Sequence, residues 1–163
     1  DDVNDIYSTG DNLYIVSEES NNDVRVYDIT NPLSPQQHTA YNMTQGGELI
    51  SVASDFRGNI LTGDHTNEFF VLGATSTQLY VRGRVVIEGG VNDITCVENN
   101  LAFIATANSN KEFIIINIAN PDAPSEYASL NFPQIGTGID FAENKVFMST
   151  RSNDSLRIIT SSP

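Results

Sequence analysis

The sequence has few of the residues on which most enzyme sites and nucleic-acid interfaces depend. Its 163 residues include one cysteine, two histidines, no tryptophan and eight lysines and arginines. A single cysteine excludes a disulfide within the chain and a cysteine-based metal site, and we expect Cys96 to be a small buried hydrophobic side chain. Twenty-one acidic residues give a formal net charge of −13, which disfavours binding to nucleic acid and to anionic lipid.

Long apolar runs and helix signals are also missing. No stretch approaches the roughly 18 apolar residues of a membrane span, so we expect no direct membrane insertion. Neither a signal peptide nor a targeting tail is recognisable, which suggests a mature form or one that has lost them. Apolar residues alternate or form short runs bounded by Asn, Asp, Gly, Ser and Pro. This pattern is typical of an all-β protein.

One phrase occurs twice in the chain. The sequence VNDI at residues 3–6 opens a segment that ends in DITNPLSP at residues 28–35. VNDI at residues 91–94 opens a second segment, which ends in NIANPDAP at residues 117–124. Diverged copies lie between and after them. The equivalent positions are Leu13, Ile60, Leu101 and Val146, and the successive spacings are 47, 41 and 45 residues. That is the period of a four-stranded propeller blade, roughly 40–45 residues.

We therefore predict an all-β fold, a β-propeller of about four blades with four antiparallel strands each and an incomplete last blade. Residues 1–163 would form a single propeller domain or a partial propeller, with repeats at about 1–44, 45–87, 88–132 and 133–163. Strands are expected at 3–8, 12–17, 24–29, 37–42, 49–53, 60–63, 68–72, 79–87, 91–97, 101–106, 113–118, 127–131, 139–142, 146–150 and 156–160.

The last repeat lacks a fourth strand. Either four blades close imperfectly or the chain is part of a larger propeller, and we favour the larger propeller. In both cases the open blade edge would admit a strand from a partner or from another copy.

The end of the repeat resembles a known family. Residues 26–35 and 115–124 carry an apolar run followed by Asp/Asn-Ile-x-Asn-Pro-x-x-Pro, with Asn117 in place of the acidic residue in the later copy. This motif is similar to that of the LVIVD-repeat β-propellers, which belong to the WD40-like superfamily. The second and fourth repeats lack it. The resemblance implies a propeller fold and a secreted or cell-surface setting, in a family whose members are commonly of unassigned function.

Asp5, Asp93 and Asp140 are candidate metal ligands. Asp5 and Asp93 fall on innermost strands, which line the central channel of a propeller, and Asp140 joins them if its repeat is aligned at residues 138–141. Alignment through Val146 puts Gly138 there instead, and Val52 is expected at that place in the second repeat. A ring of carboxylates could hold Ca²⁺. The alternative, which we favour, is that Asp5 and Asp93 bind backbone amides between blades.

Other candidate sites carry weaker signals. The acidic loop at residues 18–23, echoed at 108–112 and 152–154, lacks the spacing of an EF-hand and is expected to be solvated. Asp64 and His65 lie together in a loop, but no nucleophile motif accompanies them. His38 is expected at a solvated position of an outer strand. Arg82 and Arg84 are expected to pair with nearby acids.

The sequence predicts a non-enzymatic binding or structural module of an exported or cell-surface protein, with a protein or carbohydrate ligand. No cofactor is expected, apart from the candidate Ca²⁺. Two alternatives remain: a structural subunit that self-associates through open blade edges, and a propeller hydrolase or lyase with Asp5, Asp93 and His65 at the channel mouth. Fold alone does not decide among these classes.

Overall fold

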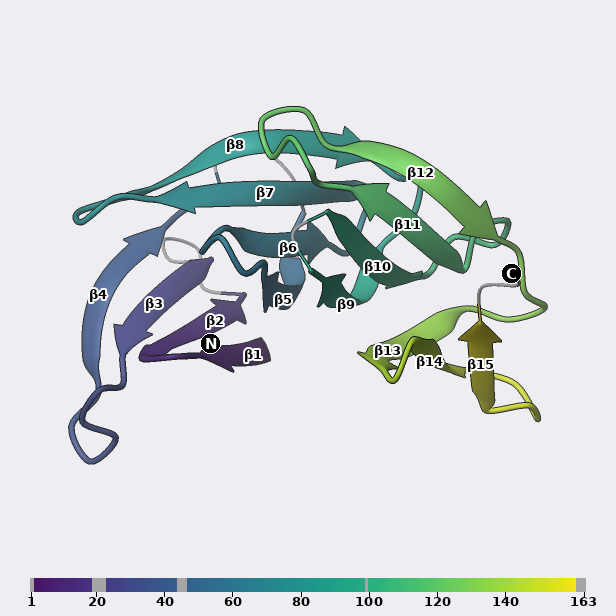
Figure 1. Ribbon diagram of the computed structural model, residues 1–163, viewed down its shortest axis with the longest axis horizontal. Coiled ribbons are helices and arrows are strands. Elements are labelled where there is room, and N and C mark those ends of the chain that lie inside the picture. Colours follow the sequence, from purple (N-terminus) through teal and green to yellow (C-terminus); the bar gives the residue numbers. More distant parts are fainter. Residues whose placement is uncertain (1, 19–22, 44–46, 99, 161–163) are drawn as a thin grey trace.

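The computed structural model describes residues 2–18, 23–43, 47–98 and 100–160. These residues form fifteen strands in four antiparallel sheets, which follow one another along the chain as blades 1 to 4 (Figure 1). The fold is a β-propeller with three strands in its last blade. The predicted fold class is therefore confirmed.

Each blade is a meander in which consecutive strands pair. Blade 1 contains β1 (Val3–Thr9), β2 (Asn12–Ser17), β3 (Val24–Asp28) and β4 (Gln36–Tyr41). Blade 2 contains β5 (Leu49–Ser54), β6 (Ile60–Asp64), β7 (Glu68–Ala74) and β8 (Leu79–Val86). Blade 3 contains β9 (Val91–Val97), β10 (Leu101–Thr106), β11 (Phe113–Asn117) and β12 (Ser125–Leu130). Blade 4 contains β13 (Gly136–Ala142), β14 (Lys145–Thr150) and β15 (Leu156–Thr160).

Tight turns join the inner strands, as the sequence predicts. Gly10 and Gly58 adopt positive φ angles of 55° and 83° in two of these turns, which glycine does without steric cost. Glu98 and Asn144 take the same left-handed conformation in the matching turns of blades 3 and 4. The predicted strand ends agree closely with the observed ones. The largest difference is at β13, which begins at Gly136 rather than at the expected residue 139.

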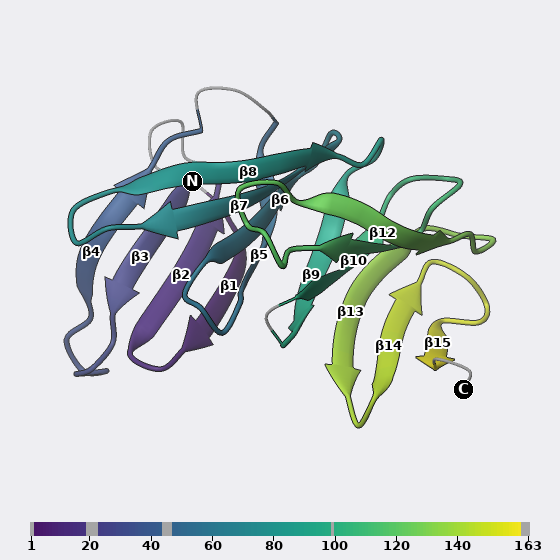
Figure 2. The ribbon, with the colours of Figure 1, turned by 45° about the horizontal axis from the view of Figure 1, so that its top comes forward.

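The innermost strands lie in one row and set the arrangement of the blades. β5 packs between β1 and β9, and β9 packs between β5 and β13. β1 and β13 are the two ends of the row, and both ribbon views show blades 1 and 4 separated by a gap, so the blades form an open arc (Figures 1 and 2). Three apolar clusters fill the spaces between successive blades. This packing explains the alternating pattern, since each side of an inner blade faces a neighbour.

Candidate binding site

Asn4 and Asp5 of β1 tie blade 1 to blade 2. Asn4 Nδ2 donates to the carbonyl of Leu49 (2.7 Å), and the Asp5 Oδ2 atom accepts from the amide of Val52 (2.8 Å). The other Asp5 oxygen accepts from Ile6 N (2.8 Å). Both carboxylate oxygens of Asp5 are therefore bound to backbone amides.

Asn92 and Asp93 of β9 repeat this arrangement between blades 3 and 4. Asn92 Nδ2 donates to Gly136 O (2.5 Å), and Asp93 accepts from Ile139 N (2.6 Å) and Ile94 N (2.8 Å). The expectation that these aspartates bind amides between blades is confirmed. The repeated phrase is thus an inter-blade clamp, with the asparagine as donor and the aspartate as acceptor.

Asp140 does not hold the matching place in blade 4. The strand register aligns Gly138 with Asp5 and Asp93, since each follows the bulge of its innermost strand. Asp140 lies on an exposed part of β13 and accepts from Phe141 N (2.8 Å).

Blade 2 also departs from the alignment made on sequence. The register puts Ser51 rather than Val52 at the clamp position, and its hydroxyl donates weakly to Val91 O (3.4 Å). The expectation of Val52 at this place is wrong because the turn between β5 and β6 is one residue longer than the turn between β1 and β2: Ser54 pairs with Ile60, whereas Ser8 pairs with Leu13.

The three aspartates still influence one another electrostatically. Burial raises the pKa of Asp93 above its usual value, hydrogen bonds from Ile139 and Ile94 oppose this, and the charges of Asp5 and Asp140 raise the pKa further. Within the described part of the chain, no three His, Cys, Asp or Glu side chains form a group suited to a metal ion. A calcium site at these aspartates stays a prediction.

Asp64 organises the loop that contains His65. Its buried carboxylate accepts from the amides of Gly47, Asn67 and Glu68 at 2.8–2.9 Å. Burial alone would raise the pKa of Asp64, but these hydrogen bonds and those from Thr66 lower it below its usual value. The His65 side chain is exposed and lies against Gly47. The pair therefore builds a turn, and Asp64 does not orient the imidazole.

The acidic loop after β2 lies mostly outside the described residues, which omit residues 19–22. Asp23, at its end, accepts from Met43 N (2.5 Å), and Glu112 in the matching loop of blade 3 accepts from Phe132 N (2.6 Å). Burial raises the pKa of Asp23. Both carboxylates fasten the segment that leaves the fourth strand of their blade.

Two other expectations concern single side chains. Arg82 forms a two-pronged ion pair with Asp122 (2.8 and 2.9 Å), and Arg84 pairs with Glu68 (3.0 Å), so both arginines pair with nearby acids as predicted. Cys96 is half-buried and packs against the core between blades 2 and 3. Burial raises the pKa of its thiol to about 12.

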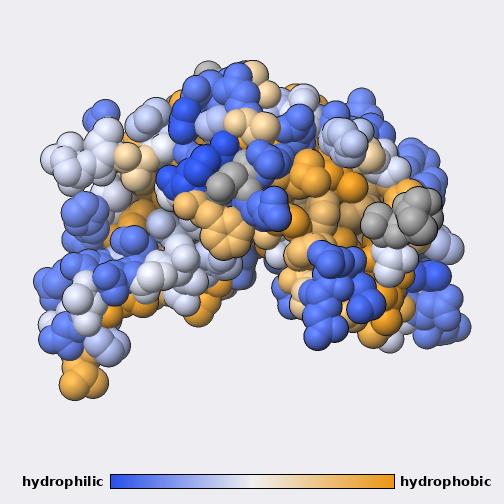
Figure 3. All heavy atoms as spheres, in the orientation of Figure 1, coloured by the Kyte–Doolittle hydropathy of each residue, from blue (hydrophilic) through white to orange (hydrophobic). Residues whose placement is uncertain are grey.

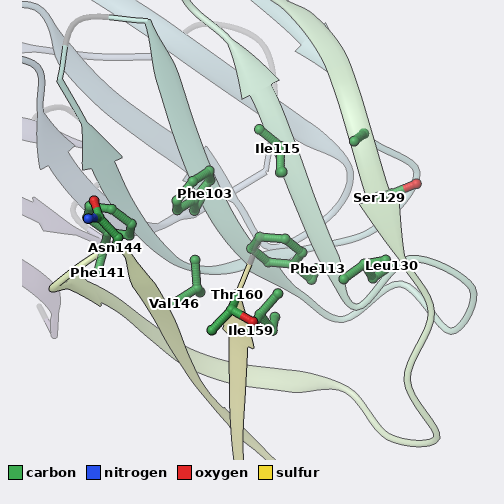
Figure 4. Close-up of a pocket in the computed structure, with 11 residues that line it drawn as sticks. Phe103, Phe113, Ile115, Ser129, Leu130, Phe141, Asn144, Val146, Ile159 and Thr160 are labelled. Atoms are coloured by element: carbon green, nitrogen blue, oxygen red, sulfur yellow. The ribbon is translucent and has the colours of Figure 1, made fainter. Parts of the chain in front are cut away.

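An apolar cavity of about 490 Å³ lies between blades 3 and 4 (Figure 4). Its lining residues come from both blades: Phe103, Phe113, Ile115, Ala128, Ser129, Leu130, Phe141, Asn144, Val146, Ile159 and Thr160. Figure 3 shows hydrophobic side chains at the surface in this half of the molecule. Such a cavity beside an exposed apolar surface is a candidate binding site.

The cavity exists because no fourth strand covers it within the described residues. Blade 2 shows the normal arrangement, in which Leu79 of β8 is buried against Val24 and Val26 of blade 1. In blade 4 the outermost described strand is β15, and its Ile159 faces blade 3 beside the cavity. Leu130 on the opposite wall stays 44% exposed. The cavity and the outer edge of β15 therefore form one continuous site.

The aromatic residues of this cavity also belong to the core between blades 3 and 4. Phe103 and Phe113 are buried and pack against each other, and Phe141 also packs against Phe103. The signal for a site was the strand count of the last repeat, since the described part of blade 4 has no fourth strand and Leu130 on the cavity wall stays exposed.

Comparisons with known proteins support the fold but give no family. No family model matches the chain, and no curated protein matches its sequence. Among solved structures, it is similar to the β-propeller domain of Myceliophteria thermophila Cps50 (Swd1), with a TM-score of 0.74 and 11% identity over 98% of this chain and 54% of that one. It is also similar to the computationally designed protein Ika8, with a TM-score of 0.73 and 13% identity over 96% of this chain and 45% of that one.

A second designed protein, Ika4, matches with a TM-score of 0.70 and 9% identity over 99% of this chain and 92% of that one. The chain thus spans about half the length of Ika8 and of the Cps50 domain. At these identities the comparisons show the fold, a β-propeller. No helix that could span a membrane occurs in the described ranges.

Proposed function

We propose that this chain is a non-enzymatic binding module of an exported or cell-surface protein, and that it binds an extended segment of a partner protein along β15. The observation that carries the proposal is the apolar cavity beside the outer edge of that strand. Strand addition supplies main-chain hydrogen bonds, and a neighbouring pocket selects the side chain.

The register defines which side chain the site would take. Ile159 pairs with Val146 of β14, and both residues pack toward blade 3. A residue placed opposite Ile159 on an added strand would point to the same side of the sheet. It would enter the cavity between Ile159 and Leu130. The site therefore suits an extended segment with one large apolar side chain at this position.

Charge favours a basic partner segment. The chain has a formal net charge of −13, and long-range attraction raises the association rate of an oppositely charged ligand. The apolar cavity favours a protein segment over a carbohydrate, whose hydroxyl groups it would leave without hydrogen-bond partners.

The exported setting rests on composition and resemblance. Two glycosylation triplets begin at Asn42 and Asn153, both of which are exposed. Two copies of the Asn-Pro-x-x-Pro motif support membership of the LVIVD-repeat family. When the source cells are fractionated, the protein is expected at the cell surface or in the medium.

The binding test uses a strand from the protein itself as the probe. A synthetic peptide of residues 77–87 contains β8, a complete fourth strand whose Leu79 is buried against the preceding blade. We expect this peptide to bind the intact chain and to protect the amides of β15 from hydrogen exchange. Leu130→Asp should weaken binding by about 10-fold or more, because it puts a charge into the apolar wall.

Phe56→Asp is the matched control, since Phe56 is 76% exposed in a turn of blade 2, away from the cavity. It should leave the affinity unchanged. Equal affinities for the wild-type chain and Leu130→Asp, or peptide binding without protection of β15, would rule out this site.

A further inference from the structure

The two ends of the arc each present an uncovered blade face. We call the side of a blade that faces the next blade along the chain its forward face, and the opposite side its backward face. The backward face of blade 1 carries Ile6, which is 60% exposed. The forward face of blade 4 carries Leu156 and Ile158, which are each 57% exposed. Large aliphatic side chains are thus displayed at both ends.

These end faces match the interface between blades 2 and 3 at most of their apolar positions, although Arg25 stands where blade 3 has Ile114. On the forward side, Asp140, Phe147, Leu156 and Ile158 of blade 4 correspond to Ala53, Leu61, Phe69 and Val71 of blade 2. On the backward side, Ile6, Leu13, Ile15 and Tyr27 of blade 1 correspond to Ile94, Ala102, Ile104 and Ile116 of blade 3. The counterparts in blades 2 and 3 are all 0–5% exposed. The ends therefore have the residue pattern of a blade interface without its partner.

The curvature of the arc allows the ends to be covered by an identical arc. Both ribbon views show blades 1 and 4 at opposite ends, and Figure 3 shows the open space between them. The chain superposes on 54% of the Cps50 propeller domain with a TM-score of 0.74. Because a propeller arranges its blades around a central channel, an arc that matches half of one has the curvature of a half ring.

The two end faces also differ in charge. Arg25 of β3 pairs with Ile15 and therefore lies on the backward face of blade 1. Asp140 of β13 pairs with Phe147 and lies on the forward face of blade 4. A forward face brought against a backward face puts a face with an acidic side chain opposite a face with a basic one, whereas two identical faces put like charges opposite each other. The charges thus favour head-to-tail contact.

We propose that a second copy of this chain closes the ring, with blade 4 of each copy against blade 1 of the other. The product has four blades from each copy, eight in all, and two identical interfaces related by a two-fold axis. Both interfaces form in one association event, so the second needs no further loss of translational freedom. This inference goes beyond the proposed binding function and uses different surfaces.

The first test is the mass of the intact chain in solution, measured by light scattering and sedimentation velocity over a range of concentrations. We expect twice the 17.8 kDa of one chain. Ile158→Asp on blade 4 and Ile6→Lys on blade 1 should each raise the dissociation constant by about 30-fold or more, the scale of a central interface residue. Both positions are more than half exposed, so the fold should persist, and circular dichroism checks this. Phe56→Asp should leave the dimer intact.

Mixing the two variants tests the head-to-tail geometry. In a mixed pair one interface joins the unaltered faces, and the other joins the carboxylate introduced by Ile158→Asp to the ammonium group introduced by Ile6→Lys. Neither variant alone retains an unaltered interface, because each copy contributes both faces. We therefore expect the equimolar mixture to recover the dimer that each variant has lost.

Three results would overturn the proposal. One is a monomer at all concentrations, and another is a dimer that Ile158→Asp does not weaken. The third is a mass that keeps rising with concentration, because an arc that does not close produces open filaments. The dimer and the peptide-binding site can be tested independently. Ile6→Lys should leave binding of the residue 77–87 peptide unchanged, and Leu130→Asp should leave the dimer intact.

Discussion

Blades 2 and 3 differ from blades 1 and 4 in burial, although all four are built on the same strand pattern. Ile104 in blade 3 is fully buried, while its counterpart Ile15 in blade 1 is half-buried. Leu61 in blade 2 is fully buried, while Phe147 in blade 4 is half-buried. Burial in this fold is therefore set by the number of neighbouring blades, and an identical alternation of side chains gives different stability at the centre and at the ends.

Blades 2 and 3 are also joined by contacts that reach the Asn-Pro turn of the repeat. Arg57 of blade 2 donates to the carbonyls of Ile118 (2.7 Å) and Ala119 (3.0 Å). Gly83 lies so close to this turn that an added Cβ would stand 2.4 Å from Pro124. The matching turn of blade 1 lies at the open end, where Leu33 is 95% exposed. The same motif is thus a packing surface at the centre and a free surface at the end.

The largest expected effect comes from emptying one matched position in each region. Ile104→Ala should lower the free energy of unfolding by about 2–5 kcal/mol, because it leaves a cavity between blades 2 and 3. Ile15→Ala should cost about half as much or less, since its side chain is already partly in contact with water. Urea unfolding of both variants measures the difference.

Dimer formation would change this comparison in a defined way. If a second copy covers Ile15, the loss of unfolding free energy caused by Ile15→Ala should grow with protein concentration. In the Ile158→Asp background, which does not form the dimer, this loss should return to its smaller monomer value. Equal losses at Ile104 and Ile15 in the monomeric background would contradict the interpretation of burial.

A smaller effect is expected at the buried polar position that ends the second strand of each blade. Asp64→Asn in blade 2 should cost about 2–4 kcal/mol, because the NH2 group of the new amide cannot accept the hydrogen bonds that one carboxylate oxygen takes from Gly47 and Thr66. Thr150→Val, its counterpart in blade 4, should cost about 1 kcal/mol, as it removes the bond to Asp154 O (2.9 Å). Thermal or urea unfolding of the two variants gives both values.

The stability contributions of Asp64 and Thr150 should also differ in their pH dependence. Because the pKa of Asp64 is lower in the folded chain than its usual 3.8, its contribution is fully present above that value and is lost as pH falls through the folded pKa. The difference between wild type and Asp64→Asn should therefore shrink on acidification, whereas the effect of Thr150→Val should not change. A pH-independent loss at Asp64 would show that its charge is not what stabilises the loop.

The fold could be predicted from sequence because every blade repeats the same local signals. Short alternating strands, turn residues such as Gly10 and Gly58, and a period of roughly 40 residues act within one repeat and need no knowledge of distant contacts. The aspartate clamp was also predictable, since Asp5 and Asp93 occupy the same place in two repeats.

Two features could not be predicted in this way. The place of Val52 was predicted wrongly because the turn between β5 and β6 holds one residue more than the turn between β1 and β2, which shifts the count along the strand. The two alignments of blade 4 could not be separated, since Gly138 and Asp140 are two residues apart and lie on the same side of the strand. The cavity beside Ile159 depends on the distance between blades 3 and 4 where the described residues include no fourth strand, and this distance is set by tertiary packing.

The smallest expected effect concerns the clamps, which differ between the centre and its flanks. Asp93→Asn should cost about 1–2 kcal/mol, because the amide oxygen replaces one of two bonds to backbone amides and leaves the other amide without its acceptor. Ser51→Ala between blades 2 and 3 should cost less than about 1 kcal/mol, as it removes a long bond of 3.4 Å. Thermal unfolding of both variants measures this order.

The pH dependence of Asp93 should be opposite to that of Asp64. Burial raises the folded pKa of Asp93 above 3.8, so its contribution is fully present below 3.8 and is lost as pH rises through the folded pKa. The difference in unfolding free energy between wild type and Asp93→Asn should therefore shrink as pH rises.

A calcium site at Asp93 predicts a different result. Added Ca²⁺ would raise the melting temperature of the wild-type chain, a chelator would reverse the rise, and Asp93→Asn would abolish it. Both oxygens of Asp93 already accept hydrogen bonds from backbone amides. We therefore expect the same melting temperature with calcium and with a chelator. A melting temperature that rises with calcium would show that an ion, and not the aspartate clamp, links blades 3 and 4.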